Sequence, residues 1–337
     1  MNPQSTSRTP LLSVKNLRKH FPVKAQQLGG PRLMVQAVDG VDFDIEQGQT
    51  LGIVGESGCG KSTTARLLMH LIIPDTGEIA LNGRPVMRPD GIELRELRRQ
   101  MQMVFQDSYA SLNPRLTVVD SIAFGPRAHG ADREKARGRA RELLSLVKLD
   151  PDQFGPRYPH QLSGGQRQRV NFARALALEP RLVILDEAVS ALDKSIEAQV
   201  LNLLMDLKRD LALTYLFISH DLNVVQYVSD HVLVMYLGKV MEYGSVDDIY
   251  HRPRHPYTQA LLASRPSMDP DVKLEASPLV GDPPNPINPP SGCRFRTRCA
   301  YAEGVCEKTE PRLHALRAKG HAVACHMSIS GSGHSKA

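Results

Sequence analysis

A complete phosphate-binding motif is present in the segment Gly55-Glu56-Ser57-Gly58-Cys59-Gly60-Lys61-Ser62-Thr63. Its glycines let the backbone curl so that successive N–H groups point at phosphate oxygens, and a helix beginning near Ser62 adds the positive end of its dipole. The whole segment is therefore expected to bind a nucleotide. Lys61 is expected to bridge the β- and γ-phosphates, and the Ser62 hydroxyl to ligate Mg²⁺. Cys59 occupies a variable position, where only its small size is expected to matter.

The flanking segments have the strand and helix character that this motif requires. Residues 50–54 form a short apolar run typical of a buried strand, and residues 62–70 are compatible with a helix. Two further buried strands are expected at 182–185 and 215–218, and apolar residues at helical spacing between them predict a crossover helix. These segments predict an α/β fold with parallel strands.

Two other regions are expected beside this core. Alternating segments at 11–17, 37–45 and 77–83 predict an antiparallel β layer, with a turn signal at Asp39-Gly40. Residues 107–165 lack strong strand signals and carry charged helix-forming residues, so a helical subdomain is expected there.

Two carboxylates follow the strand at 182–185. Asp186 is expected to hold Mg²⁺ through water, and Glu187 to orient and polarise the water that attacks the phosphate. An acidic pair at a strand end is common, so it becomes a strong signal only together with a complete phosphate motif. His220 lies two residues past the strand at 215–218 and is expected to donate to the γ-phosphate, although a lone histidine is usually structural.

The segment Leu162-Ser163-Gly164-Gly165-Gln166, together with the phosphate motif, resembles the signature of ABC-type ATPases. The resemblance implies a nucleotide-binding domain with a RecA-like core, an antiparallel β subdomain and a helical subdomain. In that family the signature closes over ATP held by the phosphate motif of a different subunit. The resemblance therefore implies that Ser163, Gly164, Gly165 and Gln166 contact ATP bound to a second ATPase chain.

The same resemblance assigns expected roles to four further positions. Gln106 corresponds to the glutamine loop, which touches Mg²⁺ and reports the nucleotide state to the helical subdomain. Asp193, in Ser190-Ala191-Leu192-Asp193, corresponds to the loop that crosses the dimer interface. Phe21 stands where the family places an aromatic ring that stacks on adenine, most often a tyrosine. The separation of His220 from Glu187 matches that of the switch histidine.

Two segments resemble a narrower group, the ATPases of dipeptide and oligopeptide importers. They are residues 105–115, Phe-Gln-Asp-Ser-Tyr-Ala-Ser-Leu-Asn-Pro-Arg, and residues 255–262, His-Pro-Tyr-Thr-Gln-Ala-Leu-Leu. The resemblance implies an ATP-hydrolysing subunit that works with a second, related ATPase under two membrane permeases, fed by an external binding protein. The segment around Gln106 would receive a coupling helix from a permease. Such a protein would sit peripherally on the cytoplasmic face of the inner membrane.

Other functions remain as alternatives. Importers of nickel, glutathione and antimicrobial peptides have similar ATPases. A soluble ABC ATPase acting on DNA is disfavoured because the distance from Gly55 to Leu162 leaves no room for a long coiled coil. One acting on the ribosome usually carries two cassettes, and this chain has one set of motifs. A regulatory subunit that binds ATP without hydrolysing it is disfavoured because Glu187 and His220 are both present.

Composition agrees with a globular ATPase without a membrane span. Hydrophobic residues make up 41% of the 337 residues and charged residues 23%, which is ordinary for a globular protein. The net charge of +6 comes from 42 basic and 36 acidic residues that are mostly interleaved, so no nucleic-acid partner is expected. No run approaches the roughly 18 apolar residues needed to span a bilayer, and the chain is expected to stay in the cytoplasm.

A change of composition near residue 265 predicts a domain boundary. Residues 1–265 are expected to form the nucleotide-binding domain, and residues 266–337 a proline-rich linker, a cysteine-rich extension and a disordered tail. The linker prolines are Pro278, Pro283, Pro284, Pro286, Pro289 and Pro290. Proline at this density excludes a continuing helix or a central strand.

Four cysteines with the spacing C-x5-C-x6-C-x18-C lie in this extension: Cys293, Cys299, Cys306 and Cys325. Disulfides are unlikely in a reducing cytoplasm, where clustered cysteines more often bind metal. The gaps are wider than those of zinc knuckles, so spacing alone leaves Zn²⁺, a 4Fe-4S cluster and unligated thiols open. The importer resemblance implies the 4Fe-4S cluster. Arg294, Arg296 and Arg298 are expected to offset the negative charge of thiolate ligands.

Overall fold

A computed structural model describes residues 9–23, 33–265, 281–282, 284–316 and 320–337. These residues fall into two compact units. The first unit holds those within Met1–Leu11, Ile45–Thr50 and Leu81–Ser219, and the second holds those within Leu12–Asp44, Leu51–Ala80 and His220–Ala337. Among the described residues, no helix is both long and apolar enough to cross a membrane.

Three parallel strands form the core of the first unit. They are β6 (Met101–Val104), β7 (Leu182–Asp186) and β8 (Thr214–Ile218), with β7 in the middle. All residues of β7 and β8 are buried, which is why both read as unbroken apolar runs in the sequence. The expected strands are confirmed, and so is the helix between them, α7 (Lys194–Asp210), whose apolar face is buried.

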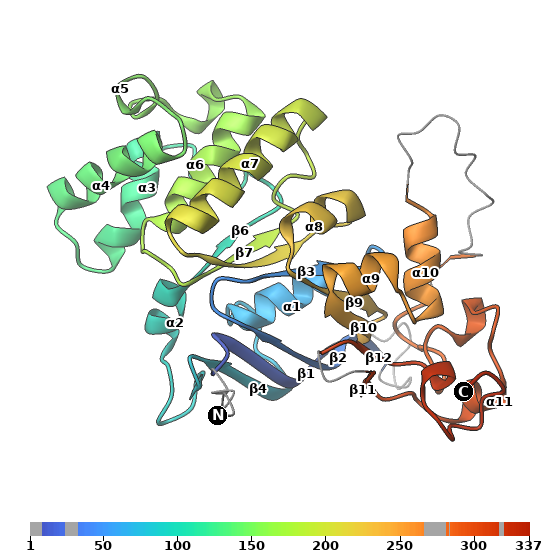
Figure 1. Cartoon of the computed structure of the whole chain (residues 1–337). Helices are drawn as coiled ribbons and strands as arrows, with labels where there is room; N and C mark the ends of the chain where they lie inside the picture. The colour runs from blue at the N-terminus through green and yellow to red at the C-terminus, as the bar shows by residue number, and fades with distance from the viewer. Residues whose placement is uncertain (1–8, 24–32, 266–280, 283, 317–319) are drawn as a thin grey trace, which may run out of the picture. The chain divides into compact units, whose positions relative to one another are not determined.

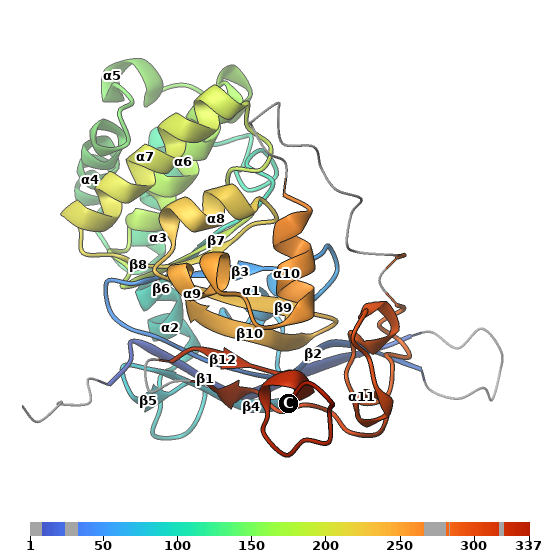
Figure 2. The same ribbon diagram turned by 45° about the vertical axis from the view of Figure 1, so that its right-hand side comes forward.

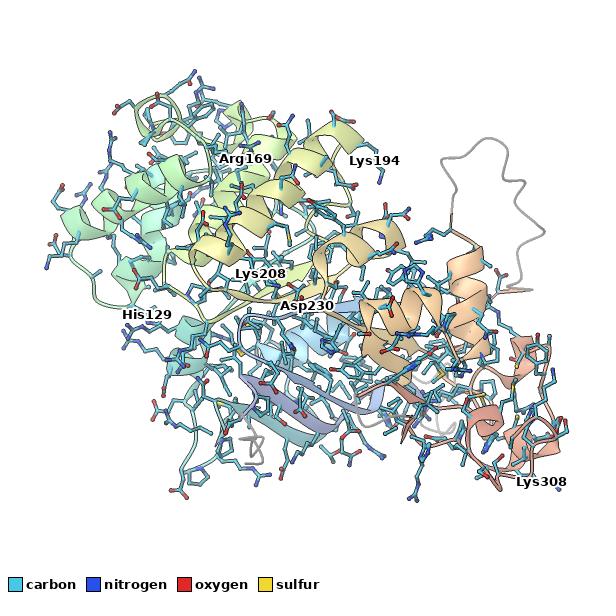
Figure 3. All side chains as sticks on the ribbon, viewed as in Figure 1. His129, Arg169, Lys194, Lys208, Asp230 and Lys308 are labelled. Carbon is cyan, nitrogen blue, oxygen red and sulfur yellow. The ribbon has the colours of Figure 1, made fainter. Side chains whose placement is uncertain are left out.

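Helices make up most of the rest of the first unit. Three of them, α3 (Val118–Ala128), α4 (Arg133–Leu146) and α6 (Gly164–Leu176), pack against one another (Figure 1). Figure 3 shows Arg169 on α6 and Lys194 at the start of the neighbouring α7. The helices expected within residues 107–165 are therefore present. The smaller elements are β5 (Arg84–Pro85), α2 (Leu94–Gln100), α5 (Pro151–Phe154) and η1 (Pro159–Gln161).

The second unit contains a mixed sheet in the order β11-β12-β10-β9-β3. Its strands are β3 (Thr50–Val54), β9 (His231–Tyr236), β10 (Lys239–Ser245), β11 (His314–Ala315) and β12 (Ala322–Val323). The β3–β9 pair is parallel, and the pairs along β9-β10-β12-β11 are antiparallel. Its helices are α1 (Lys61–Leu68), α8 (Leu222–Val228), α9 (Val246–His251) and α10 (Pro256–Ala263). Both α9 and α10 pack against β10.

A second sheet in this unit places β1 (Leu12–Pro22) between β2 (Met34–Ile45) and β4 (Thr76–Leu81). The three expected strands are present, and β1 and β2 are longer than expected. The turn at Asp39-Gly40 was a wrong prediction, because both residues lie inside β2. Gly40 takes a φ of 77°, and a Cβ there would lie 3.3 Å from the Asn16 side chain. This glycine therefore serves a close approach of side chains within the sheet.

The C-terminal extension, meaning the described residues from Pro284 onward, belongs to the second unit. Its strand β12 pairs with β10 at the edge of the mixed sheet, as Figure 2 shows. It also contains η2 (Arg296–Arg298), α11 (Gly304–Lys308) and η3 (His326–Ser328). Lys308 is labelled at the end of α11 in Figure 3. Pro278 and Pro283 of the expected linker lie outside the described residues.

The disordered tail expected over the last ten residues is also corrected. His334 is buried, and its Nε2 lies 2.9 Å from the carbonyl oxygen of Tyr301. The backbone N–H of Ser335 donates to the Glu303 carboxylate at 2.9 Å. Serine and glycine suggested disorder in the sequence, but these long-range hydrogen bonds hold the segment in place.

Candidate functional site

The phosphate motif forms a turn between β3 and α1 in the second unit. Gly55, Gly58 and Gly60 have φ values of 147°, 78° and 109°, which side-chain-bearing residues rarely adopt. A Cβ at Gly55 would lie 2.1 Å from the Met235 carbonyl oxygen, and one at Gly60 would lie 2.2 Å from the Ala37 carbonyl oxygen. The close approach of other backbone segments therefore requires glycine at both positions.

Lys61 is the first residue of α1, and its side chain is held by the motif itself. Its ammonium donates to the carbonyl oxygens of Gly55 at 2.7 Å and Glu56 at 3.0 Å. Ser62 and Thr63 follow in the first helical turn and are half-buried, while Ser57 and Gly58 are exposed at the tip of the loop. The loop thus presents hydroxyl groups, an ammonium group and a helix N-terminus within one short segment, which suits a phosphate ligand.

Cys59 is buried inside this loop. Burial raises the pKa of its thiol, and the nearby Lys61 only partly opposes that effect. The thiol is therefore neutral, in agreement with a packing role. Phe21, the expected adenine-stacking ring, lies half-buried on β1 in the same unit, with the Lys19 ammonium 5.6 Å from its ring centroid.

The two carboxylates at the end of β7 belong to the first unit. Asp186 is 4% exposed, and the backbone N–H of Glu187 donates to the Ile218 carbonyl oxygen at 2.9 Å. Glu187 has a φ of 49°, a left-handed conformation that costs on the order of 1–3 kcal/mol and tends to occur at functional positions. Gln106 Nε2 donates to Glu187 Oε2 at 3.0 Å. The structure therefore brings together two expected site residues from distant parts of the chain.

The signature segment begins α6 in the same unit. Ser163 is the N-cap: its hydroxyl accepts from the Gln166 backbone N–H at 3.3 Å, and the Gln166 side chain accepts from the Ser163 N–H at 2.9 Å. Gly165 is buried against α7, where a Cβ would lie 2.6 Å from Ile196 Cγ2. Gly164 is only partly buried and has more room. A local contact at the start of α6 thus explains the residue type at Ser163, Gly165 and Gln166.

The remaining expected residues lie at the ends of elements. Asp193 is exposed at the N-cap of α7, and the Ser190 hydroxyl donates to the Glu187 carbonyl oxygen at 2.9 Å. His220 is exposed just past β8 and is counted with the second unit. Gln106, Asp186 and Glu187 thus lie in the first unit, and His220 and the phosphate loop lie in the second.

The four cysteines of the C-terminal extension line one small pocket, the cysteine pocket. All four are free thiols. Burial raises the pKa of Cys293 to about 12 and that of Cys325 to about 11, and it also raises the pKa of Cys299. Burial thus favours the neutral thiol over the thiolate at these three positions.

The cysteine pocket does not close around a single ion. In the part of the chain that the structure describes, no group of three or more His, Cys, Asp or Glu side chains is arranged to hold a metal ion. Two histidines that line the pocket have other partners: His326 Nε2 lies 2.9 Å from the Thr309 carbonyl oxygen, and His334 is bound to Tyr301.

Two of the arginines near the cysteines have a different role from the one expected. Arg294 pairs with Asp39 of β2 and also donates to the Leu237 carbonyl oxygen. Arg298 pairs with Glu56 of the phosphate loop. Both guanidinium groups thus neutralise carboxylates that lie outside the C-terminal extension. The sequence showed the arginine cluster but could not show its carboxylate partners, which lie more than two hundred residues earlier.

Comparison with protein families gives two matches on this chain. Residues 38–190 match the family described as ABC transporter. Residues 241–306 match the family described as oligopeptide/dipeptide transporter, C-terminal region. The second match spans part of the C-terminal extension, including Cys293, Cys299 and Cys306.

Several curated proteins are similar over nearly the whole chain. A putative peptide import ATP-binding protein of Brucella ovis is 49% identical over 95% of this chain and 98% of its own length. The dipeptide transport ATP-binding protein DppF of Escherichia coli is 47% identical over 96% of each chain. The oligopeptide transport ATP-binding protein OppF of Salmonella typhimurium is 47% identical over 96% of this chain and 98% of its own. The importer resemblance drawn from two short segments is thereby confirmed.

Solved structures agree on the fold. CbiO1 from Clostridium perfringens, part of an ABC transporter complex, superimposes with a TM-score of 0.61 and 26% identity over 72% of this chain and 92% of its own. The ATP-binding cassette MJ0796, solved as a dimer bound to ADP and phosphate, gives a TM-score of 0.59 and 28% identity over 70% of this chain and 98% of its own. Both support the expected nucleotide-binding fold.

Proposed function

Because this chain belongs to the ABC transporter family of peptide-import ATP-binding proteins, we propose that it is the ATP-hydrolysing subunit of an importer for dipeptides or oligopeptides. The observation that carries the proposal is similarity to such proteins over nearly the full length, including the C-terminal region. An ATPase domain alone would not indicate the transported substrate. Nickel, glutathione and antimicrobial peptides remain the alternative substrates.

Hydrolysis would depend on positioning and on charge stabilisation. The loop from Gly55 to Thr63 would hold the phosphates, with Lys61 moving its ammonium from the loop carbonyls to the β- and γ-phosphates. Glu187 would orient and polarise the attacking water, and its bond from Gln106 supports that role by fixing one carboxylate oxygen. His220 would donate to the γ-phosphate, and Phe21 would stack on adenine.

Ser62, Gln106 and Asp186 would hold Mg²⁺, directly or through water. Hydroxyl, amide and carboxylate oxygens are the ligands that this ion prefers, and the nearly buried Asp186 carboxylate fits such a role. When bound, the ion would supply positive charge that neutralises the charge on the transferred phosphoryl group. The hydrogen bond to Glu187 uses the Gln106 amide nitrogen, so the amide oxygen would be the atom that holds the ion.

A second ATPase subunit would complete the site. Ser163, Gly164, Gly165 and Gln166 would contact ATP held by that partner, and Asp193 would lie at the interface between the two. The dimeric state of the solved relative MJ0796 supports this arrangement. The pair would work under two permeases at the cytoplasmic face of the membrane, supplied by an external binding protein.

The experiment reconstitutes the subunit with its permeases in lipid vesicles and measures ATP hydrolysis and uptake of a labelled dipeptide. Glu187→Gln is expected to lower turnover about a hundredfold or more while retaining ATP binding, because it removes the group that polarises water. Glu179→Gln, at an exposed position outside the site, is the matched control. Wild-type turnover in Glu187→Gln would refute the assignment. Uptake of nickel or glutathione without uptake of dipeptide would show that the transported substrate is not a peptide of the proposed kind.

We further propose that the cysteine pocket holds a 4Fe-4S cluster in the cell. Four cysteines that line one pocket would supply the four thiolates that such a cluster needs. Cys293, Cys299, Cys306 and Cys325 would each hold one iron. The cluster, when bound, would supply a rigid cross-link between segments of the extension that have few regular elements.

Anaerobic purification of the full chain tests this cluster. The expected product is brown and contains four iron and four sulfide per chain by the proposed stoichiometry. Cys299→Ser is expected to lower both contents, whereas Cys59→Ser, in the phosphate loop, is expected to leave them unchanged. A colourless protein that contains zinc, or neither metal, would overturn the proposal.

A further inference from the structure

The C-terminal extension reaches into the phosphate loop through one ion pair. Arg298 Nη1 donates to Glu56 Oε2 at 2.7 Å, and Arg298 Nη2 donates to Glu56 Oε1 at 3.0 Å. The arginine side chain is 5% exposed and the glutamate side chain 21%. A two-point pair that is largely shielded from water fixes orientation as well as distance, unlike a typical surface salt bridge. It therefore sets the position of the second residue of the loop.

The backbone of Glu56 connects this pair to Lys61. Its carbonyl oxygen accepts from the Lys61 ammonium at 3.0 Å, and its N–H donates to the Tyr257 hydroxyl at 3.0 Å. The carboxylate, the carbonyl and the N–H of Glu56 thus each have a named partner. Displacement of Glu56 therefore removes one of the two carbonyl contacts that hold the Lys61 ammonium, which is the group expected to meet the phosphates.

Arg298 is itself supported by an aromatic cluster formed by Tyr236, Tyr257 and Phe295. Its guanidinium lies 5.9 Å from the Tyr236 ring centroid, and its Nη1 donates to the Tyr236 hydroxyl at 3.4 Å. The Phe295 ring meets Tyr236 edge-on at 5.5 Å and Tyr257 at 5.3 Å. All three rings are buried, so the support is rigid.

The cysteine pocket adjoins this support along the chain. Phe295 lines the pocket, and Arg298 directly precedes Cys299. The backbone N–H of Arg298 donates to the Phe295 carbonyl oxygen at 3.0 Å, which closes the short η2 turn between them. A change in the packing of the pocket therefore acts on the segment that presents Arg298 to the loop.

We propose that Arg298 is a positioning residue for ATP binding, through which the cysteine pocket is coupled to the phosphate loop. It acts in two ways, by holding Glu56 in place and by neutralising a carboxylate that would otherwise repel the phosphates. The inference rests on the proposed role of the loop in holding ATP. It does not depend on which group fills the cysteine pocket.

Titration calorimetry with the full chain, Mg²⁺ and the non-hydrolysable analogue adenosine 5′-(β,γ-imido)triphosphate tests the inference. Arg298→Gln is expected to weaken binding about tenfold, and Arg298→Lys less, because lysine retains the charge but not the two-point geometry. Glu56→Gln combined with Arg298→Gln is expected to recover at least half of the loss on a logarithmic scale, since both charges are then absent.

The matched control is Arg312→Gln in the same extension, at an exposed position that does not line the cysteine pocket; the affinity of this variant should equal that of the wild type. Unchanged affinity in Arg298→Gln would overturn the inference. Equal losses of affinity in Arg298→Gln and in the control variant, or no recovery of affinity in the double variant, would also overturn it. Lys61→Ala tests the role of the phosphate loop separately from that of Arg298. If this variant still binds the analogue, the proposed role of the loop in holding ATP is wrong. In the assembled importer, Arg298→Gln should raise the KM for ATP more than it lowers kcat.

Discussion

Glu242 on β10 is completely buried and lies 2.8 Å from the Nε2 atom of His321 in the C-terminal extension. Its carboxylate also accepts the backbone N–H groups of Arg254, at 2.7 Å, and His255, at 3.0 Å. These partners satisfy a buried charge that would otherwise be costly. One carboxylate therefore joins the sheet, the start of α10 and the extension.

Glu242→Gln tests how much this junction stabilises the second unit. The amide has one oxygen where the carboxylate had two, so at least one buried N–H loses its acceptor, at a cost of about 1–3 kcal/mol. Urea unfolding should show a lower midpoint for this variant. Glu307→Gln, at an exposed position of α11, should leave the midpoint unchanged. Identical midpoints for the two variants would show that the junction contributes little.

His255 predicts a pH dependence of stability. Burial lowers the pKa of His255 to about 4, whereas an unfolded histidine titrates near about 6.5. The unfolded state therefore binds more protons between these values, and stability falls as the pH drops from about 6.5 to 4, by up to about 3 kcal/mol. Denaturant unfolding at several pH values would measure this loss.

The His255 side chain also caps α10, because its Nδ1 accepts from the Tyr257 N–H at 3.0 Å. His255→Asn keeps an N-cap acceptor but cannot titrate, so its stability should vary less with pH than that of the wild type. His255→Ala should lose about 1 kcal/mol more than the asparagine variant at pH 7. A pH profile that is the same in wild type and His255→Asn would assign the acid loss to other groups.

Gly165→Ala is expected to destabilise the first unit. The new methyl group would lie 2.6 Å from Ile196 Cγ2, an atom that cannot move without shifting the side chain, at a cost of about 1–3 kcal/mol. Gly164→Ala meets only Leu192 Cδ2, at 3.7 Å, and should fold as stably as the wild type. Thermal unfolding compares the two. In the assembled importer both should lose ATPase activity, and activity retained by Gly164→Ala would argue against a contact with the partner's ATP.

Gln106→Ala removes the hydrogen bond that orients Glu187. Turnover in the assembled importer should fall about tenfold, while stability changes by less than about 0.5 kcal/mol because the glutamine is exposed. Gln100→Ala serves as control, since the Gln100 amide bonds to Glu96 within α2. If both variants retain full turnover, the contact with Glu187 has no part in hydrolysis.

Much of the fold could be predicted because its signals are local. The buried strands β3, β7 and β8 were visible as apolar runs, and the backbone of the phosphate loop demands glycine at fixed places. The prediction of a turn at Asp39-Gly40 was wrong because an Asp-Gly pair suits a turn and also suits a strand in which neighbouring side chains come close to the backbone. Only the neighbouring strand, through Asn16 and Arg18, distinguishes these cases.

The sequence alone determined the family, the residues expected to hold and hydrolyse ATP, and the presence of four clustered cysteines, because each depends on residue type and spacing along the chain. Only the tertiary structure decided that the C-terminal extension joins the sheet through β12 and pairs Arg298 with Glu56. Such contacts between distant segments depend on how side chains fill shared space, and no periodicity in the chain encodes them. The same reason explains why the tail around His334 is packed although its composition suggests disorder.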